Sequence, residues 1–590
     1  MIYTIKKIAI TFVILIAIIP FAQGQKTDTV IWKALNDELS RNINHLSYLD
    51  YQKPFFIGYA LGSSENAIVL GSLGAIVMSN ENKIKSEMIR VMVGNYQICD
   101  ENFENENNSV RYTGGNILLP IDDDYYGIRR TLWIQTDKVY KAAGETYKNK
   151  IYILKRNNIP TDSLVPDFGK APVSKLKFEG SGYLYNKKEW ENRVREISAY
   201  FSKYPDIDDS GVSFRFAKVN TYLVNSEGTE VKSPVDAAII SVAAFSTASD
   251  GARLSSKIEV VVPTPNDIPA NEWFKQEVDK LAKHLINLKN AETFNGNYTG
   301  PVMFTGQAAS ELIAGSLFSQ EDPLIAIREP LYADRNMKIF AGNNPNSLET
   351  KLNKKVISND LTVKALPQLK AFEGVKLIGH YDVDADGVVP PQEVLLVENG
   401  VLKSLLCDRT PTRMVPQSNG HRRFALFNGA VSYLTGPGVI EVSGKKQNTE
   451  AELKQKLIEK AKEEGLDFAI LVKQVIHNTP TFPVEIYKVS VSDGKETLIR
   501  SAGFNSVSLS TLRKCIGTSN RKVAYNMLMS VGGNAGGLFG SFIPEISGLP
   551  VSVISPDALL IEEMEMEGSP KNLSEEKPIV PNPVSELIKK

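Results

Sequence analysis

Apolar residues recur at helical spacing in four parts of the chain, and each stripe predicts an amphipathic helix. Pro205 ends the second of these helices, and Thr449 with Glu452 forms a capping box at the start of the fourth. The four stripes are Leu35, Leu39, Ile43 and Leu46; Trp190, Val194, Ile197 and Phe201; Val278, Leu281, Leu285 and Leu288; and Leu453, Leu457 and Ala461.

Between these helices, runs of β-branched and aromatic residues alternate with Gly, Ser and Asn, which predicts strands separated by turns. Such runs fill Phe55 to Val93, Val212 to Val224 and Ala237 to Val262. Beyond Asn290 the pattern is mainly strand and turn, with one helix from Thr449 to Gly465. The predicted fold class is therefore α+β, with an N-terminal α/β region followed by a β-rich C-terminal domain.

A chain of 590 residues is expected to form two or three domains, because single cores stop growing at about 250–300 residues. Prolines at 263, 265 and 269 suggest a boundary before the third predicted helix. The predicted divisions are a signal peptide at 1–24, an N-terminal α/β domain at 25–165, a central domain at 166–290, a β-rich C-terminal domain at 291–568 and a flexible tail at 569–590.

The first residues have the organisation of a secretory signal peptide. Lys6 and Lys7 precede an apolar run from Ile8 to Ala22, and small residues at Ala22 and Gly24 suit a signal peptidase, so the mature chain is expected to begin near Gln25. The run is shorter than the ~20 residues of a spanning helix, which argues against the alternative of a membrane anchor. We expect an exported protein, periplasmic or secreted, without a membrane anchor after cleavage.

The charge and the cysteine content argue against nucleic acid as a partner and against a cysteine-based framework or zinc site. Lys and Arg number 67 against 68 Asp and Glu, and no stretch concentrates basic residues, so nucleic acid is not an expected partner. The three cysteines, Cys99, Cys407 and Cys515, are too scattered for a disulfide framework or a Cys-x-x-Cys zinc site.

Three segments in the second half of the chain carry distinctive motifs. The first is GPVMFTGQAASELIAG from Gly300. The second runs from Gly379 to Arg423 and contains an acidic turn, the hairpin turn Glu398-Asn399-Gly400 and a loop rich in Gly and Arg. The third is VGGNAGGLFG from Val531, followed by VSVISPDALLIEEMEMEG. These segments resemble, in the same order, the TldD/PmbA metallopeptidase family. The N-terminal half resembles the family only loosely, chiefly through the NSEGT turn at 225–229.

The resemblance implies that the metal site has been lost. Catalytic members carry His-Glu-x-x-x-His on a helix and a cysteine in a Gly-Asn-Cys-Gly segment, which together hold zinc and activate water. The histidine positions fall on Gly306 and Glu311, the glutamate position on Gln307 and the cysteine position on Ala535. No histidine lies between positions 284 and 380, so a shifted alignment does not restore the motif. We therefore expect no metal and no other cofactor, as in the metal-free PmbA (TldE) branch.

One other segment matches a metal-binding pattern. Asp382, Asp384, Asp386, Gly387 and Glu393 satisfy the twelve-residue calcium loop. A calcium hand requires a helix on each side, whereas the flanking residues here have the composition of strands. We therefore interpret the segment as an acidic β-turn and keep calcium as the weaker alternative.

The remaining candidates are histidines and arginines. His421, Arg422 and Arg423 lie in a loop that faces the substrate cleft in the family, so the resemblance makes them candidates for binding substrate. His45, His284 and His477 lie on amphipathic elements and are expected to be structural.

The resemblance implies a non-catalytic subunit that pairs with a catalytic TldD-type homologue, or forms a homodimer, and acts on peptides or unfolded proteins. Two alternatives remain. One is an active peptidase with an unrecognised site that uses Glu311, His380 or His421. The other is a stand-alone peptide-binding or glycan-binding protein.

Overall fold

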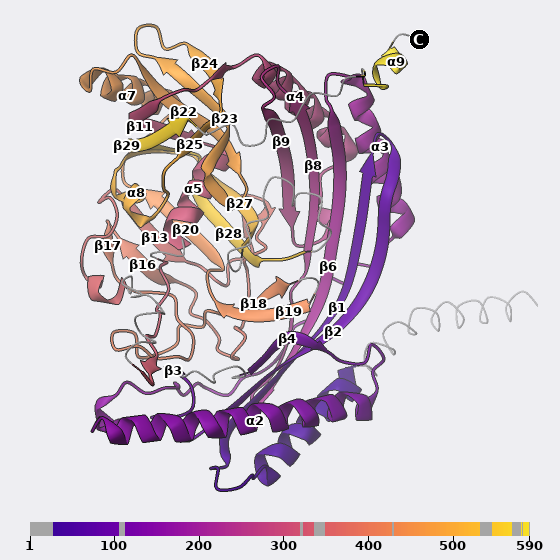
Figure 1. Ribbon diagram of the computed structural model, residues 1–590, viewed down its shortest axis with the longest axis vertical. Helices are drawn as coiled ribbons and strands as arrows, with labels where there is room; N and C mark the ends of the chain where they lie inside the picture. Colours follow the sequence, from indigo (N-terminus) through magenta and orange to yellow (C-terminus); the bar gives the residue numbers. More distant parts are fainter. Residues whose placement is uncertain are drawn as a thin grey trace, which may run out of the picture.

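The computed structural model describes residues 28–104, 112–318, 323–334, 348–427, 430–530, 546–568, 580 and 582–588. Its mixture of helices and largely antiparallel sheets confirms the α+β fold class (Figure 1). The predicted signal peptide at 1–24 and the predicted mature start at Gln25 lie outside the described residues. Within the described ranges, no helix has both the length and the apolar character needed to cross a membrane.

The first sheet is built on a long hairpin. Strands β1 (Pro54–Ser72) and β2 (Ala75–Val93) pair antiparallel along their length. Leu73 and Gly74 form the two-residue turn, both with positive φ (47° and 83°), as a type I′ hairpin turn requires. The other strands of this sheet are β4 (Tyr112–Leu118), β5 (Lys175–Lys177), β6 (Asp209–Asn225), β7 (Glu230–Pro234), β8 (Ala237–Thr247) and β9 (Arg253–Val262).

The predicted division between residues 25–165 and 166–290 does not separate two sheets. Strand β6 pairs with β1 from Gly58 to Gly71, so segments from both predicted domains share one hydrogen-bonded layer. Local sequence patterns carry no information about which distant strands pair, so they could not indicate this shared sheet.

The turns that we predicted inside Phe55 to Val93 are mostly absent, because the Gly- and Ser-containing segment of β1 continues as strand. Gly62 lies in this segment, and a Cβ atom there would be 2.5 Å from Cγ2 of Val431. The glycine therefore allows β19 (Ala430–Thr435) to pack closely on the sheet.

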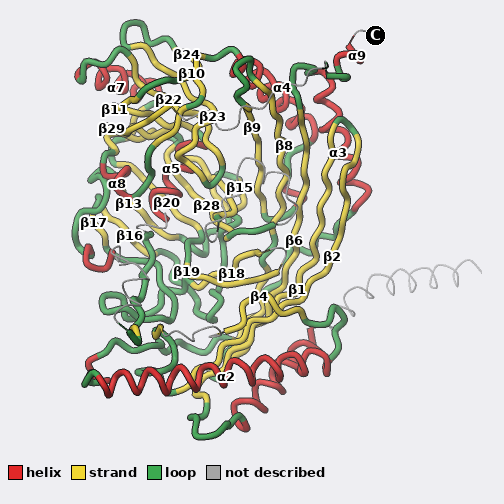
Figure 2. The backbone as a smooth tube through the Cα atoms, viewed as in Figure 1, coloured by secondary structure: helices red, strands yellow, loops and turns green. Residues whose placement is uncertain are grey.

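The two faces of the first sheet pack against different parts of the protein. Side chains alternate along a strand, so in β1 Tyr59 and Leu61 pack against helices while Ala60 packs toward the C-terminal half. A helix over residues 28–45 and α2 (Tyr125–Arg156) cover one end of the helical face, and α3 (Lys187–Ala199) and α4 (Asn271–Lys289) cover the other. Figure 2 shows the sheet as one long curved layer beside the C-terminal half.

Three of these helices confirm the predicted stripes, but α2 was not predicted. Its buried positions include Thr136, Gly144 and Thr146 among the apolar residues, which interrupts the 3.6-residue apolar pattern. Asp124 caps its start by accepting a hydrogen bond from the backbone amide of Gly127.

Two sheets make up the C-terminal half, and all their strands follow residue 290. The nine-stranded sheet contains β10 (Glu292–Thr293), β11 (Asn297–Thr305), β21 (Gln447–Asn448), β22 (Phe468–Ile476), β23 (Thr479–Ser490), β24 (Glu496–Arg500), β25 (Ala502–Phe504), β26 (Cys515–Ser519) and β29 (Ala558–Gly568). The six-stranded sheet contains β13 (Leu361–Ala365), β16 (Val394–Glu398), β17 (Val401–Leu402), β20 (Val439–Gly444), β27 (Lys522–Met529) and β28 (Leu549–Pro556).

Three two-stranded sheets and several short helices complete the described fold. The two-stranded sheets pair β3 (Phe103–Glu104) with β12 (Leu331–Tyr332), β14 (Ala371–Phe372) with β15 (Val375–Lys376), and β18 (Arg422–Phe427) with β19. The short helices are η1 (Thr161–Ser163), η2 (Tyr200–Lys203), η3 (Pro265–Asp267), η4 (Leu348–Lys351), α8 (Leu509–Arg513) and α9 (Ser585–Ile588).

Helix α5 (Gln307–Phe318) lies in the core shared by the two C-terminal sheets, and most of its residues are buried. Helix α7 (Glu450–Glu463) packs on the other side of the nine-stranded sheet and has the predicted capping box at Thr449. The predicted hairpin turn is also present, with positive φ at Asn399 and Gly400 between β16 and β17.

The described part of the predicted flexible tail is docked on the protein. Asn582 donates a hydrogen bond to the carbonyl oxygen of Ile207 at 2.9 Å, and Val584 is buried. The amide of Asn582 satisfies a backbone carbonyl that follows η2, which composition alone did not indicate. Residues 569–579 lie outside the described residues.

Candidate functional site

The helix assigned to the lost metal motif, α5, points two polar side chains at the end of strand β22. Gln307 and Glu311 are four residues apart, so they share one face of the helix. The Gln307 amide bonds both backbone groups of Val475: its Nε2 donates to the carbonyl oxygen at 3.2 Å and its Oε1 accepts from the amide at 3.0 Å. The side chain of Gln307 therefore satisfies the two backbone groups of Val475 as a neighbouring strand would.

Glu311 is 1% exposed, and both of its carboxylate oxygens are engaged. Oε2 accepts the backbone amide of Asn478 at 3.0 Å, and Oε1 accepts the hydroxyl of Tyr525 at 2.8 Å. His477 Nδ1 lies 3.2 Å from Oε1 and 2.8 Å from the Tyr525 hydroxyl. A buried carboxylate needs such partners, because leaving it without hydrogen bonds costs several kcal/mol.

The hydrogen bonds assign the proton on His477. Burial, followed by the charge of Glu311, raises the pKa of Tyr525 well above its usual value, so the phenol keeps its proton. That single proton is donated to Glu311, and the phenol oxygen must then accept from Nδ1 of His477. In its neutral form His477 is therefore protonated on Nδ1 and unprotonated on Nε2.

His477 was expected to be structural, and the sequence offered no sign of its place beside Glu311. The two residues come from β22–β23 and α5, and only the parallel pairing of β11 with β22 brings these segments together. No local pattern could have indicated this contact, because Tyr525 and Glu311, which complete the group around His477, are 214 residues apart in the sequence.

Glu259 lies on strand β9 of the first sheet and interacts electrostatically with the cluster formed by Glu311, His477 and Tyr525. Its Oε2 accepts the Ser241 hydroxyl at 2.7 Å and lies 2.6 Å from Lys257 Nζ. Burial alone would raise the pKa of Glu259, but Lys257, His477 and Arg215 together hold it below its ordinary value. The cluster therefore lies at the junction of the first sheet with the C-terminal half.

The other two positions that the resemblance assigns to the metal motif are Gly306 and Ala535. Gly306 precedes α5 with φ +56°, donates its amide to the carbonyl of Asp557, and would place a Cβ atom in open space. A histidine at this φ would be strained. Ala535 lies outside the described residues. Ser530, the last described residue before it, donates its amide to Asn478 Oδ1 at 3.2 Å.

The described residues do not fit the zinc that the family implies. Among them, no group of three or more His, Cys, Asp and Glu side chains is placed to hold a metal ion. Gln307 has no anionic oxygen, and the two oxygens of Glu311 accept hydrogen bonds from within the protein. A zinc site normally has three or four protein ligands.

The acidic segment at 382–393 is a turn held by its own backbone. Asp384 is 2% exposed, and its Oδ1 accepts the amides of Asp386 and Val388 at 2.9 and 2.8 Å. Asp386 Oδ1 lies 3.3 Å from Arg90, and Glu393 pairs with Lys364 at 3.0 Å, so the carboxylates point to separate cations. Strands β15 and β16 flank the segment, in place of the helices of a calcium hand.

His421 is not placed to contact a substrate in an open cleft. It is 0% exposed, its Nδ1 lies 3.0 Å from the carbonyl of Asn419, and burial, with Arg423 second, lowers its pKa to about 3. Arg422 pairs with Asp408 at 2.7 Å, and Arg423 donates to the carbonyl of Pro437 at 2.8 Å. Both arginines line a cavity that also contains His380, whereas His421 packs behind it.

A buried ion pair joins the NSEGT turn of the first sheet to the C-terminal half. Arg409 is 1% exposed and binds both oxygens of Glu227, at 2.6 and 2.7 Å. Its Nε donates to the carbonyl of Gly169 at 2.8 Å, and its guanidinium covers the ring of Phe168. The NSEGT turn, through which the N-terminal half chiefly resembles the family, is therefore a docking point for the C-terminal half.

Comparisons with known proteins agree with this architecture. The fold is similar to that of a structure described as a proposed modulator of a DNA gyrase from Thermotoga maritima, with 14% sequence identity and a TM-score of 0.53. The match covers 87% of this chain and 96% of that chain. A similar protein from Bacteroides thetaiotaomicron matches at 13% identity and 0.53, with 91% of this chain and 98% of that chain covered. TldE from Thermococcus kodakarensis matches with 13% sequence identity and a TM-score of 0.50, over 87% of this chain and 97% of that chain.

At these identities the structural matches show the fold alone. No match was found among curated proteins. The family model for the PmbA/TldA metallopeptidase C-terminal domain matches residues 295–568, which contain both C-terminal sheets from β11 onward and helix α5. Residues 295–568 of the chain therefore form a C-terminal domain of the PmbA/TldD metallopeptidase family.

Proposed function

We propose that this chain is the metal-free, non-catalytic subunit of a two-component peptidase, in which a zinc-bearing homologue cleaves peptides or unfolded proteins. One observation carries the proposal: Gln307 and Glu311, on the helix of the lost motif, direct their polar atoms into hydrogen bonds with Val475, Asn478 and Tyr525. Zinc hydrolysis needs a metal with an open water position and a free carboxylate as base. The described side chains provide neither.

Metal content and activity test this function directly. The purified chain alone is expected to contain no stoichiometric zinc and to cleave no unfolded protein or peptide, because its polar groups on α5 are already occupied. Elemental analysis and a peptide-release assay measure both quantities. A homologue that keeps His-Glu-x-x-x-His, purified in the same buffers, is the control. Zinc at one atom per chain, or a chelator-sensitive cleavage by the isolated protein, would remove the proposal.

The partnership requires a separate measurement. Mixing the chain with a TldD-type homologue from the same organism is expected to give a complex in native mass spectrometry and peptide cleavage in the mixture. A homodimer that never exchanges with the homologue would favour the stand-alone binding protein instead.

We also propose that the subunit acts outside the cytoplasm, on the basis of the signal-like segment at 1–24. N-terminal sequencing of protein recovered from the cell envelope is expected to begin near Gln25. Recovery of a chain that keeps Met1, in the cytoplasmic fraction, would contradict export.

The oriented imidazole of His477 favours a second candidate function, a hydrolase that uses no metal. Its unprotonated Nε2 could serve as a general base, with Tyr525 and Glu311 holding the ring as a carboxylate holds a catalytic histidine. This function predicts a weak, chelator-resistant hydrolysis that His477→Gln abolishes. Activity that survives this substitution, or the absence of any activity, excludes it.

A further inference from the structure

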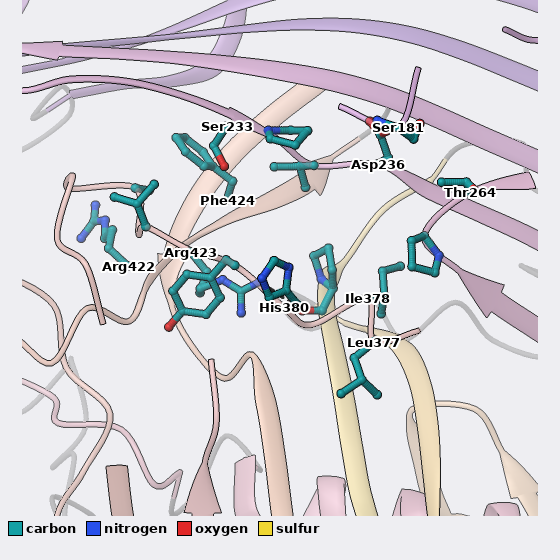
Figure 3. Close-up of a pocket in the computed structure, with 17 residues that line it drawn as sticks. Ser181, Ser233, Asp236, Thr264, Leu377, Ile378, His380, Arg422, Arg423 and Phe424 are labelled. Carbon is teal, nitrogen blue, oxygen red and sulfur yellow. Dashed lines mark hydrogen bonds between the residues drawn. The ribbon is translucent and has the colours of Figure 1, made fainter. Parts of the chain in front are cut away.

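A cavity of about 210 Å³ lies between the first sheet and the C-terminal half, away from the cluster at Glu311. Residues at the ends of β7 and β9 form one wall, and the segment from Leu377 to Ala385 with the start of β18 forms the other. Figure 3 shows His380 in the middle of the view, with Arg423 on one side and Asp236 and Ser181 on the other.

Arg423 is a buried cation without an acidic partner. It is 5% exposed and forms no ion pair within the described residues. Its Nη1 donates to the carbonyl of Pro437 at 2.8 Å and its Nη2 to the carbonyl of Pro550 at 3.5 Å. Its guanidinium lies 3.9 Å from the centre of the Tyr381 ring. Buried arginines are normally paired with an anion, since desolvating an unpaired charge is costly. The guanidinium has five donor hydrogens, so these contacts leave donors for an anionic ligand.

Asp236, on the opposite wall of the cavity, is an acidic residue without a cationic partner within the described residues. Its Oδ1 accepts the amide of Val219 at 3.1 Å and its Oδ2 accepts the hydroxyl of Ser181 at 2.9 Å. No cation lies within ion-pair distance of it in the described part of the chain. The backbone amide of Ser181 also donates to Oδ2, at 3.4 Å. These three hydrogen bonds hold the carboxylate in place and leave it able to receive a positively charged group.

His380 adds a polar atom that lacks a partner. Its Nε2 is buried without a hydrogen bond, although it lies 3.4 Å from Oδ1 of Asp382. Buried polar atoms without partners are uncommon in native proteins, and a polar group of a ligand in the cavity would satisfy this one. Between the charged groups, Ile378, Phe424 and Val235 give the cavity apolar walls.

We propose that this cavity binds the zwitterion of a free apolar amino acid, with its carboxylate at Arg423 and His380, its ammonium group at Asp236, and its side chain against Ile378 and Phe424. The volume is below the range of about 300–1,000 Å³ typical of sites for drug-sized ligands, which suits a single amino acid. The placement of opposite charges on opposite walls selects a ligand that carries both. This site is independent of the proposed function.

A series of four probes tests the charge pattern by isothermal titration calorimetry on the full chain. L-Leucine is expected to bind with a dissociation constant in the range of about 1 mM or tighter. Leucinamide lacks the anion and N-acetyl-leucine lacks the cation, so each is expected to bind at least about tenfold more weakly. Glycine, which lacks the apolar group, is expected to bind more weakly as well. No leucine binding at about 10 mM, or equal binding of either blocked form, overturns the proposal.

Variants then locate the site. Asp236→Asn keeps the shape and the hydrogen bond from Val219 but removes the charge, and it is expected to weaken leucine binding about tenfold or more. Asp493→Asn, in the turn after β23, is the matched control and is expected to bind as the parent chain does. If Asp236→Asn does not fold, His380→Gln replaces it. Unchanged leucine binding in a folded variant at either position overturns the proposal.

Discussion

Replacing Arg409 with methionine is expected to lower the free energy of unfolding by about 3–5 kcal/mol. Methionine keeps most of the side-chain volume but removes both hydrogen bonds to Glu227 and the one to Gly169. The carboxylate of Glu227, 16% exposed, then remains without its cation and keeps only the hydroxyl of Tyr96. The cost comes chiefly from this uncompensated charge.

Chemical denaturation followed by fluorescence measures the Arg409→Met effect. Lys514→Met is the matched control, because Lys514 pairs with Glu563 where both side chains are 49% exposed. An exposed pair is worth about 0–1 kcal/mol, so the control should unfold almost as the parent does. If the two variants lose the same stability, the Arg409 pair does not join the two halves of the molecule in the way that we describe.

Replacing Glu311 with alanine is expected to lower the free energy of unfolding by about 2–4 kcal/mol. The change leaves the amide of Asn478 without an acceptor and removes the acceptor of the Tyr525 hydroxyl. Each buried group that loses its partner costs about 1–3 kcal/mol. Glu463→Ala, on α7 where the side chain is 65% exposed, is the control and should change stability by less than about 0.5 kcal/mol.

A double-mutant cycle with Tyr525→Phe separates the hydrogen bond from the loss of volume. Residues in direct contact show coupling of about 0.5–3 kcal/mol, so Glu311→Ala should cost less in the Tyr525→Phe background than alone. Additive effects would mean that the hydrogen bond between Tyr525 and Glu311 contributes nothing to stability. The same series should change the chemical shifts of the His477 ring in an NMR experiment, because Tyr525 contacts its Nδ1 at 2.8 Å.

Features that depend on neighbouring residues could be predicted from the sequence. The stripe from Trp190 to Phe201 gave α3, Thr449 with Glu452 gave the capping box of α7, and Asn399-Gly400 gave a hairpin turn. Each of these follows from side-chain spacing or backbone conformation within one or two turns of chain. The resemblance to the family rested on three such local segments, and the family model covers the region that they span.

Helix α2 shows the limit of such patterns even for a local element. Its 32 residues bury Thr136 and Lys150 together with apolar residues, because tertiary partners satisfy their polar groups. Periodicity of apolar residues cannot anticipate a polar residue whose partner is distant in the sequence.

The sequence by itself determined the helix at 28–45, helices α3, α4 and α7, the hairpin turn at Asn399-Gly400 and the family of the C-terminal domain. Only the tertiary structure decided that β1 and β6 share one sheet, that Glu311 meets His477 and Tyr525, and that Arg423 and Asp236 face one cavity. The physical reason is the separation of the interacting groups along the sequence. Helix periodicity and turn preferences depend on residues a few positions apart, whereas strand pairing and the pairing of buried charges depend on groups that meet only when the whole chain has folded.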